Sequence, residues 1–194
     1  MNINLAPWRS PLSRNLHLHR SQPEARYLQL ATVSPAGYPT NRTVVFRGFR
    51  EGRDDIQIIS DWRSHKIAHL QHCPYGEICW YFPKTREQFR IFGEIVVITA
   101  DTVNEEYQKL RQNLWQTISD SARQQFTWAQ PASPRPDDAD FPVGVADPQL
   151  PLDNFCLLLL IPSKCDHLLL KGNPQNRYLY LKQGSEWQLE HVYP

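Results

Sequence analysis

The sequence has almost no net charge. Its 194 residues include 21 lysines and arginines and 20 aspartates and glutamates, which leaves a formal charge of +1 at pH 7. Proteins that bind nucleic acids or anionic membranes without further specificity need a strong positive field. The balance of charges therefore argues against nucleic acid and membrane as partners of the molecule as a whole.

Long apolar runs and paired cysteines are also missing. The longest apolar run, Phe155 to Ile161, is far shorter than the ~20 residues that a helix needs to cross a bilayer. The four cysteines form no CxxC pair and no signal peptide precedes them; they are Cys73, Cys79, Cys156 and Cys165. This usage leads us to expect free thiols and a cytoplasmic protein.

Several motifs that mark common enzyme classes are absent. There is no GxSxG elbow of a serine hydrolase, no GxxxxGK[ST] phosphate loop and no GxGxxG dinucleotide loop. His65, His69 and His72 have the i, i+4, i+7 spacing of one helix face, but no acidic partner accompanies them, so the zinc signal is weak. We interpret them as solvent-facing histidines and expect no metal.

The most informative stretch runs from Arg42 to Gly48 and reads Arg-Thr-Val-Val-Phe-Arg-Gly. It alternates in the manner of a β-strand, with an arginine at each end of a β-branched, apolar centre. An arginine is rarely buried without a partner, so a strand that only fills a core would not carry two of them. The pattern indicates a strand that presents cations to a ligand.

A second stretch, Ser60 to Lys66, follows a predicted strand and reads Ser-Asp-Trp-Arg-Ser-His-Lys. We predict a helix from about Arg63, which places the serine, histidine and lysine of 64–66 in its first turn. Free backbone N–H groups and the helix dipole favour an anion there. With the two arginines of the preceding strand, the stretch predicts a phosphate site. The alternative is a pair of surface arginines beside an ordinary helix start.

The ordered set Arg-x-Val-Val-x-Arg-Gly, strand, Ser-Asp and Ser-x-Lys resembles the flavin-binding core of the pyridoxamine 5'-phosphate oxidase family. Members of that family are split β-barrels that bind FMN at a dimer interface. The similarity spans about residues 25–99 and 154–194, and it is greatest to a branch described mainly as FMN-binding. It implies that FMN is the cofactor and that the chain forms a homodimer.

The resemblance also implies roles for individual residues. Arg42 and Arg47 match the basic ends of the family's FMN-binding strand, and Lys66 matches a phosphate-binding lysine whose arginine neighbour is His65 here. Other positions match groups beside the ribityl chain and the flavin ring. The full set of expected cofactor-binding residues is Arg42, Arg47, Ile59, Ser60, Ser64, His65, Lys66, Gln88 and Arg177.

Two of these residues are expected at the flavin ring. Gln88 matches a glutamine that reaches the ring, and Arg177 matches a late arginine on the flavin that would come from the other chain of the dimer. An amide or guanidinium near the N1–C2 edge of the ring stabilises negative charge on reduced flavin.

The substrate half of the motif departs from the family pattern. The oxidases of the family use an Arg-x-His pair four and two residues before the late arginine, and those positions are Asn173 and Gln175 here. Neither side chain carries a positive charge, so neither replaces a charge-assisted phosphate contact worth about 1.5–3 kcal/mol. The resemblance implies a preserved cofactor half and a rewritten substrate half.

The expected fold class is mainly β with a helical insert (α+β), an antiparallel split β-barrel formed by residues 1–194 as a single domain. Apolar periodicity predicts strands at 27–34, 42–47, 55–60, 75–82, 88–98, 154–161, 165–170, 177–182 and 187–192. It predicts helices at 10–22, 63–72, 102–118 and 119–126.

The insert is expected at about 101–153. We predict that Asp101 caps its first helix and that Val103, Tyr107, Leu110 and Leu114 form that helix's apolar stripe. Residues 128–153 hold six prolines and five aspartates, a composition typical of a lid, an arm or a disordered segment.

These observations predict an FMN-binding flavoprotein, an oxidoreductase that transfers hydride between a small substrate and FMN. Two alternatives stay open: a pyridoxamine/pyridoxine 5'-phosphate oxidase, and a flavin or small-ligand binding protein without turnover. The sequence leaves the catalytic residues, the physiological substrate and the electron acceptor, oxygen or a nicotinamide, open.

Overall fold

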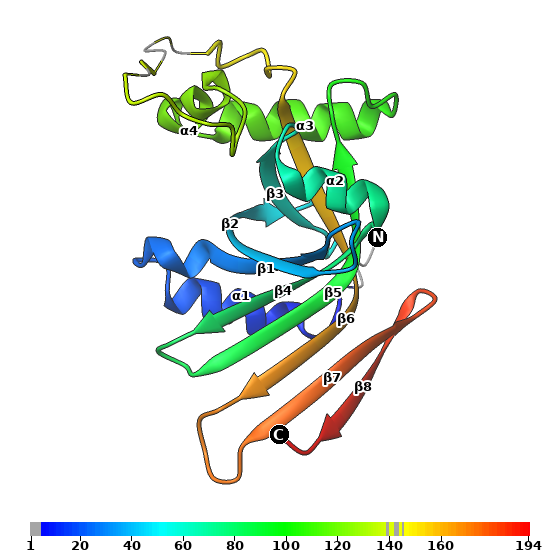
Figure 1. Cartoon of the computed structure of the whole chain (residues 1–194). Helices are drawn as coiled ribbons and strands as arrows, with labels where there is room; N and C mark the ends of the chain where they lie inside the picture. The colour runs from blue at the N-terminus through cyan, green and yellow to red at the C-terminus, as the bar shows by residue number, and fades with distance from the viewer. Residues whose placement is uncertain (1–4, 139, 142–143, 145) are drawn as a thin grey trace.

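The computed structural model describes residues 5–138, 140–141, 144 and 146–194. These residues form an antiparallel sheet of eight strands in the order β3-β2-β1-β4-β5-β6-β7-β8, and β3 also pairs with β6. This extra pairing closes the first six strands into a barrel, and β7 and β8 continue the sheet beyond it (Figure 1). The predicted fold class, an antiparallel β-barrel with a helical insert, is confirmed.

The strands are β1 (Tyr27–Val33), β2 (Pro39–Phe49), β3 (Ile56–Asp61), β4 (Tyr75–Phe82), β5 (Glu87–Ile98), β6 (Phe155–Leu169), β7 (Asn176–Gln183) and β8 (Glu186–Val192). The α-helices are α1 (Arg9–Leu18), α2 (His65–His72), α3 (Glu105–Thr117) and α4 (Asp120–Gln124). Two short 3-10 turns are η1 (Pro23–Arg26) and η2 (Gln125–Thr127). In the described part of the chain, no helix is long and apolar enough to span a bilayer.

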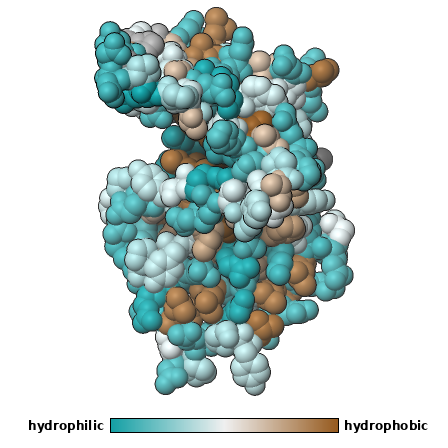
Figure 2. All heavy atoms as spheres, in the orientation of Figure 1, coloured by the Kyte–Doolittle hydropathy of each residue, from teal (hydrophilic) through white to brown (hydrophobic). Residues whose placement is uncertain are grey.

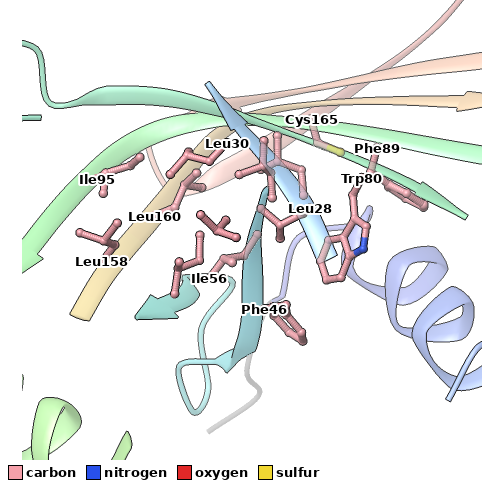
Figure 3. Packing of buried hydrophobic residues seen from close by; sticks show 14 of the residues in the cluster. Leu28, Leu30, Phe46, Ile56, Trp80, Phe89, Ile95, Leu158, Leu160 and Cys165 are labelled. Atoms are coloured by element: carbon pink, nitrogen blue, oxygen red, sulfur yellow. The ribbon is translucent and has the colours of Figure 1, made fainter. Parts of the chain in front are cut away.

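The barrel interior holds the main apolar core, because alternate residues of each strand point inward. Leu28 and Leu30 of β1 lie beside Ile56 of β3 and Leu160 of β6, and Trp80 closes one end of the cluster (Figure 3). All five side chains are fully buried. Full burial of a leucine or isoleucine contributes about 1.5–3 kcal/mol, so this cluster is the main support of the fold.

The apolar run at the start of β6 is buried on both faces. Leu158 and its inward neighbours belong to the barrel core, whereas Leu157 and Leu159 face outward. Residues 99–154, which we call the insert, cover that outward face: Leu114 of α3 packs on the leucines, and Trp115 packs on Phe155 at 4.9 Å between ring centroids. A run without alternation therefore marks the strand that lies between the barrel core and the insert.

β6 is one strand of 15 residues, where the sequence predicts two. Its first half pairs with β3 and its second half with β7, while β5 runs beside both halves. The register against β5 shifts between Phe92 and Gly93. A Cβ atom on Gly93 would lie 2.0 Å from the carbonyl oxygen of Ile161, so only glycine allows the close approach at this bend.

The boundaries of α1 and α3 differ from the prediction. α3 is capped by Asn104, whose side chain accepts a hydrogen bond from the Tyr107 N–H, and not by Asp101. A turn over 99–102, in which Thr102 bonds to Thr99, delays the helix, so Val103 is 95% exposed and lies outside the apolar stripe. α1 begins at Arg9 and ends at Leu18, before the predicted end at residue 22.

Candidate functional site

A cavity of about 500 Å³ lies between the barrel and the insert. Strands β2 and β3 and the start of α2 form one wall, and α4, η2 and the residues after them form the other; Figure 2 shows the region as a hollow between the upper part of the molecule and the barrel. The lining residues are Arg42, Thr43, Val44, Val45, Arg47, Ile59, Ser60, Asp61, Lys66, Ala122, Gln125, Phe126, Trp128, Ala129 and Pro131.

Arg42 reaches the cavity from β2 with part of its guanidinium held by the barrel. Its Nη1 donates to the Leu30 carbonyl oxygen at 3.0 Å and to Thr32 Oγ1 at 2.8 Å, and its Nη2 donates to Thr40 Oγ1 at 2.8 Å. A guanidinium has five N–H donors, so two of them are left without a protein partner in the described residues. No carboxylate pairs with Arg42 there, and burial lowers its pKa.

Arg47 is the extra residue of a β-bulge. Phe46 pairs with Ile58 and Gly48 pairs with Gln57, so Arg47 has no partner residue on β3. Gly48 has a φ of +139°, which other residues rarely adopt. Bulges redirect a side chain out of the regular alternation. Among the described residues, the buried Nε of Arg47 has no hydrogen-bond partner. Burial, and then the charge of Arg26, lower the pKa of Arg47.

Lys66 lies in the first turn of α2 and points to hydroxyl groups instead of carboxylates. Its Nζ donates to Ser60 Oγ and to Ser64 Oγ, both at 3.0 Å, and these two oxygens lie 3.2 Å apart. Burial, and then the charge of Arg42, lower the pKa of Lys66. The lysine is therefore half-buried and without an acidic partner in the described residues.

The charge of the cavity lining suits an anion. Arg42, Arg47 and Lys66 line it, and the lining carboxylate, Asp61, is already paired with Arg63. Three partly desolvated cations without neutralising acids are costly unless an anion joins them. The cavity volume is within the range of about 300–1,000 Å³ that small-molecule and cofactor sites occupy.

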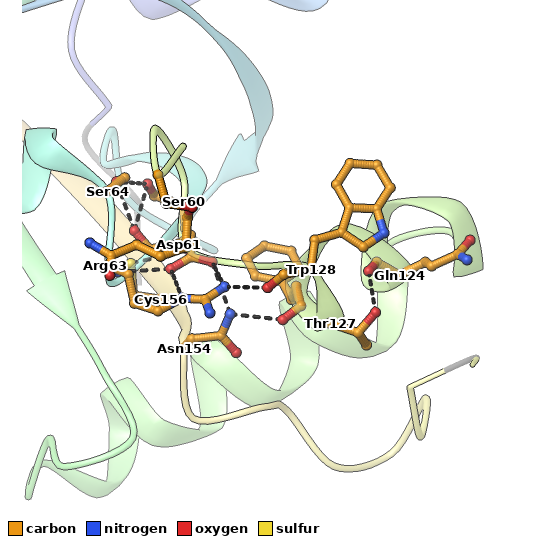
Figure 4. Close-up of polar contacts among 12 residues, drawn as sticks. Ser60, Asp61, Arg63, Ser64, Gln124, Thr127, Trp128, Asn154 and Cys156 are labelled. Carbon is orange, nitrogen blue, oxygen red and sulfur yellow. Dashed lines mark hydrogen bonds and ion pairs between the residues drawn. The ribbon is translucent and has the colours of Figure 1, made fainter. Parts of the chain in front are cut away.

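Asp61 joins the barrel to the insert. Its carboxylate accepts from Arg63 Nε at 3.0 Å, from Arg63 Nη2 at 2.6 Å and from Asn154 Nδ2 at 2.9 Å (Figure 4). Burial alone would raise the pKa of Asp61, but the hydrogen bonds from Arg63 and Asn154 hold it below its usual value. We call Asp61, Arg63 and Asn154 the insert clamp.

The clamp holds the outer wall of the cavity through main-chain oxygens. Arg63 Nη2 also donates to the Trp128 carbonyl oxygen at 3.1 Å, and Asn154 Nδ2 donates to that of Phe126 at 2.9 Å. These bonds fix η2 and the segment after it, which supplies Phe126, Trp128 and their neighbours to the cavity. The insert, whose role the sequence left open, thus forms a wall of the candidate site. Residues 139, 142–143 and 145 of the predicted loop lie outside the described part.

The remaining predicted residues divide into two groups. Ile59 and Ser60 line the cavity, and Ser64 contacts Lys66, as described above. His65 is exposed, makes no hydrogen bond or ion pair with the described residues, and is absent from the cavity lining. Ser64 is the N-cap of α2, so the helix begins at His65, two residues later than predicted.

Gln88 and Arg177 lie on the outer face of the sheet and do not line this cavity. Both are neighbours of Leu168: Gln88 is its partner on β5 and Arg177 its partner on β7. The guanidinium of Arg177 is held by Asp166 through bonds of 3.0 and 2.7 Å. The structure therefore places these two residues together with each other and apart from the three cavity cations.

Two groups of residues that build the site are not evident from the sequence: the insert clamp, and His69 with the two threonines that it contacts. The insert clamp gave no signal beyond the Ser-Asp at the end of a strand, because Asn154 is 93 residues away from Asp61. The prediction that all three histidines face solvent is right for His65 and His72 but wrong for His69, which bonds to Thr32 and Thr40. Within the described residues, no group of three or more histidine, cysteine or acidic side chains is placed to hold a metal ion.

Comparisons with known proteins identify the family. A family model described as pyridoxamine 5'-phosphate oxidase, FMN-binding domain, matches residues 5–99. The pyridoxine/pyridoxamine 5'-phosphate oxidase 2 of Arabidopsis thaliana is 39% identical over 198 residues, which cover 100% of this chain and 100% of that protein. The chain belongs to the pyridoxamine 5'-phosphate oxidase family. It is an FMN-binding flavoprotein, as the sequence predicts.

Solved structures agree with this assignment. The crystal structure of a pyridoxamine 5'-phosphate oxidase-related, FMN-binding protein from Nostoc punctiforme has 49% sequence identity and a TM-score of 0.95, and the match covers 98% of this chain and 100% of that one. PhzG from Burkholderia lata, in complex with tetrahydrophenazine-1-carboxylic acid, has 20% identity and a TM-score of 0.74 over 97% and 93% of the two chains. The likeness to PhzG concerns the fold alone.

The cavity of this family member fits one end of FMN. A phosphate monoester needs cations without competing acids, and Arg42, Arg47 and Lys66 meet that requirement. The orphaned Nε of Arg47 is a donor with no partner among the described protein groups. The hydroxyl groups of Ser60 and Ser64 lie beside Lys66 and can form hydrogen bonds with the polar ribityl chain of FMN.

Proposed function

We propose that this flavoprotein is an FMN-dependent oxidoreductase that transfers a hydride between a small substrate and its flavin. The observation that carries the proposal is the set of three partly buried cations, Arg42, Arg47 and Lys66, that line one cavity in which the described residues offer no free carboxylate. Bound FMN supplies the two-electron chemistry. The residues of the chain hold it, orient it and limit its contact with water.

Each part of the cavity has a proposed task. Arg42, Arg47 and Lys66 hold the phosphate, with Ser64 fixing the lysine. Ser60 donates to the ribityl region, and Ile59 with the aromatic residues of the insert covers the apolar part of the cofactor. His65, which is exposed, adds a long-range positive charge only when it is protonated.

We further propose that the active form is a homodimer. Gln88 and Arg177 lie together on an outer sheet face that also carries Tyr81, whose side chain is 45% exposed. A two-fold dimer would bring these residues of one copy to the cavity of the other, and each copy would complete its partner's site. The amide and the guanidinium would then face the flavin ring.

A second candidate function is pyridoxine/pyridoxamine 5'-phosphate oxidation. It is favoured by the name of the Arabidopsis relative, which matches this chain over its whole length. Against it stand Asn173 and Gln175, two uncharged side chains in the β6–β7 connection. They provide no cation for a substrate phosphate, so we propose a substrate other than these phosphorylated vitamers.

The test of cofactor binding removes two of the cavity cations. The variant Arg42→Ala/Lys66→Ala loses two charge-assisted contacts of about 1.5–3 kcal/mol each. We expect its FMN affinity, measured by quenching of flavin fluorescence, to fall by roughly 10²–10⁴-fold. The control Lys84→Ala/Lys109→Ala removes two exposed cations outside the cavity and should bind FMN as the wild type does. Retained affinity in the first variant would show that the phosphate binds elsewhere.

The test of the reaction uses the FMN-loaded protein. Pyridoxamine 5'-phosphate, pyridoxine 5'-phosphate and NAD(P)H are offered in turn, and flavin bleaching and peroxide are followed. Reduction by NAD(P)H, or by another small donor, without peroxide from the phosphorylated vitamers is the expected result. Rapid peroxide formation from pyridoxamine 5'-phosphate would select the second candidate instead, and a flavin that no donor reduces would indicate a carrier.

A further inference from the structure

His69 lies one helical turn after His65, on the side of α2 that faces the barrel. Its Nδ1 is 3.1 Å from Thr32 Oγ1 and 3.1 Å from Thr40 Oγ1. Thr32 and Thr40 are paired residues of β1 and β2, so their hydroxyls come from adjacent strands, and their Oγ1 atoms are 3.1 Å apart. A helix residue that sequence spacing assigned to solvent thus meets two strand hydroxyls.

The same hydroxyls are the acceptors for Arg42. Nη1 donates to Thr32 Oγ1 and Nη2 donates to Thr40 Oγ1, each at 2.8 Å. A hydroxyl that accepts from a guanidinium still has one proton to donate. Thr40 can donate to the Thr32 carbonyl oxygen at 3.2 Å, which leaves the proton of buried Thr32 available to Nδ1 of His69. The series of hydrogen bonds thus runs from the Arg42 guanidinium through the Thr32 hydroxyl to the imidazole of His69.

The charges around His69 favour the neutral imidazole that this series of hydrogen bonds requires. Burial, the charge of Arg42 on β2, and the neighbouring His65 and Lys66 on α2 all lower the pKa of His69. With Nδ1 as acceptor, the ring proton is on Nε2. Protonation of Nδ1 would convert the acceptor to a donor and add a second positive charge beside the guanidinium.

We propose that His69 is a positioning residue for Arg42 in the anion site. Its neutral imidazole accepts the last hydrogen bond of the series and so holds the two threonine hydroxyls in place. These hydroxyls in turn orient the Arg42 guanidinium, which keeps two of its five donors without a protein partner in the described residues. The ligand that benefits is a phosphate monoester, and this inference rests on the proposed binding of FMN by the same cavity.

A double-mutant cycle on FMN affinity tests the proposal. His69→Leu should weaken binding about tenfold when Arg42 is present and have no effect in an Arg42→Met background, because the imidazole acts only through the guanidinium. His69→Gln, whose amide oxygen is an acceptor, should recover most of the loss. His72→Leu on the same helix is the control, since His72 is exposed and makes no hydrogen bond or ion pair with the described residues. Equal losses in both backgrounds would overturn the proposal.

A second readout does not need FMN. Nitrogen NMR of the FMN-free protein should find His69 neutral at pH 7, with the proton on Nε2, and with a pKa below the ordinary value of a histidine. Arg42→Met removes a like charge and should raise the pKa of His69. A pKa that stays unchanged, or a proton on Nδ1, would contradict the proposal even if the protein bound no FMN. Failure of FMN binding in the wild type, with the NMR result as expected, would instead refute the proposed cofactor site and leave the Arg42–His69 coupling standing.

Discussion

Replacement of Arg47 by methionine should separate two effects of this arginine, its contribution to FMN affinity and its effect on the stability of the FMN-free protein. Arg47 is the bulged residue of β2, it has no acidic partner in the described residues, and its buried Nε has no hydrogen bond. A buried donor without a partner costs about 1–3 kcal/mol, and the half-exposed position of the side chain leads us to take the lower end. Methionine keeps most of the volume of the side chain and removes the orphaned donor and the repulsion from Arg26.

We therefore expect Arg47→Met to raise the unfolding free energy of the FMN-free protein by about 1 kcal/mol. In a chain of this length that corresponds to a rise of roughly 2–4 °C in Tm. The same change removes a charge-assisted contact to the phosphate and should weaken FMN binding by about 1.5–3 kcal/mol, or roughly 10–150-fold. Stability and affinity should move in opposite directions.

Arg42→Met is the matched control, because Arg42 lines the same cavity but makes three hydrogen bonds to the barrel. Its loss leaves buried Thr32 with fewer partners, so we expect about 1–3 kcal/mol of destabilisation as well as weaker FMN binding. Urea unfolding with and without FMN measures both quantities. If Arg47→Met destabilised the free protein as much as Arg42→Met does, the bulged arginine would have a structural partner and the reasoning would be wrong.

Two further predictions concern the insert and the second copy of the chain. Asp61→Asn should lower the unfolding free energy by about 1–3 kcal/mol at pH 7. Because the folded pKa of Asp61 is depressed, this contribution is complete above about pH 4–5 and disappears as the pH falls below that range. Urea unfolding at a series of pH values should therefore show the stabilities of the two proteins converge in acid. The proposed dimer is tested by refolding a 1:1 mixture of Arg42→Ala/Lys66→Ala with Gln88→Ala/Arg177→Ala. Half of the dimers should be mixed, and each mixed dimer has one intact site, so about one quarter of the wild-type FMN sites should be recovered. No recovery in flavin titrations would mean that the site lies within one chain.

Local sequence patterns predicted the barrel well. Alternation located β1 to β5, and the start of the apolar run at Phe155 located β6, because strand burial is a property of neighbouring residues. The break predicted inside β6 was wrong, since the strand continues past Pro162 where Gly93 on β5 permits a close approach. Gly93 precedes Pro162 by about seventy positions, so the local sequence around Pro162 carries no information about this contact.

The candidate site could be predicted in part for the same reason. Arg42 and Lys66 belong to contiguous motifs, so sequence spacing placed them near one another, and the structure brings them into one cavity. The insert clamp depends on Asn154, and the fixing of Arg42 depends on His69 meeting two strands, contacts that only the closed barrel creates. The positions of Gln88 and Arg177 relative to the flavin depend on a second chain, so their assignment stays a prediction.

The contrast between the two arginines bears on how this fold meets its function. The barrel core is consistent at every level, with apolar residues on the inward face of each strand and fully buried leucines between core and insert. Arg42, Arg47 and Lys66, which have no free acidic partner among the described residues, line one cavity, where a bulge and a glycine with positive φ present Arg47. A site that breaks local rules inside an otherwise consistent fold is expected where a ligand completes the interactions. Cofactor binding then stabilises the folded chain by RT ln(1 + [FMN]/Kd), so Arg47, which weakens the free protein, is among the groups that make its stability depend on FMN.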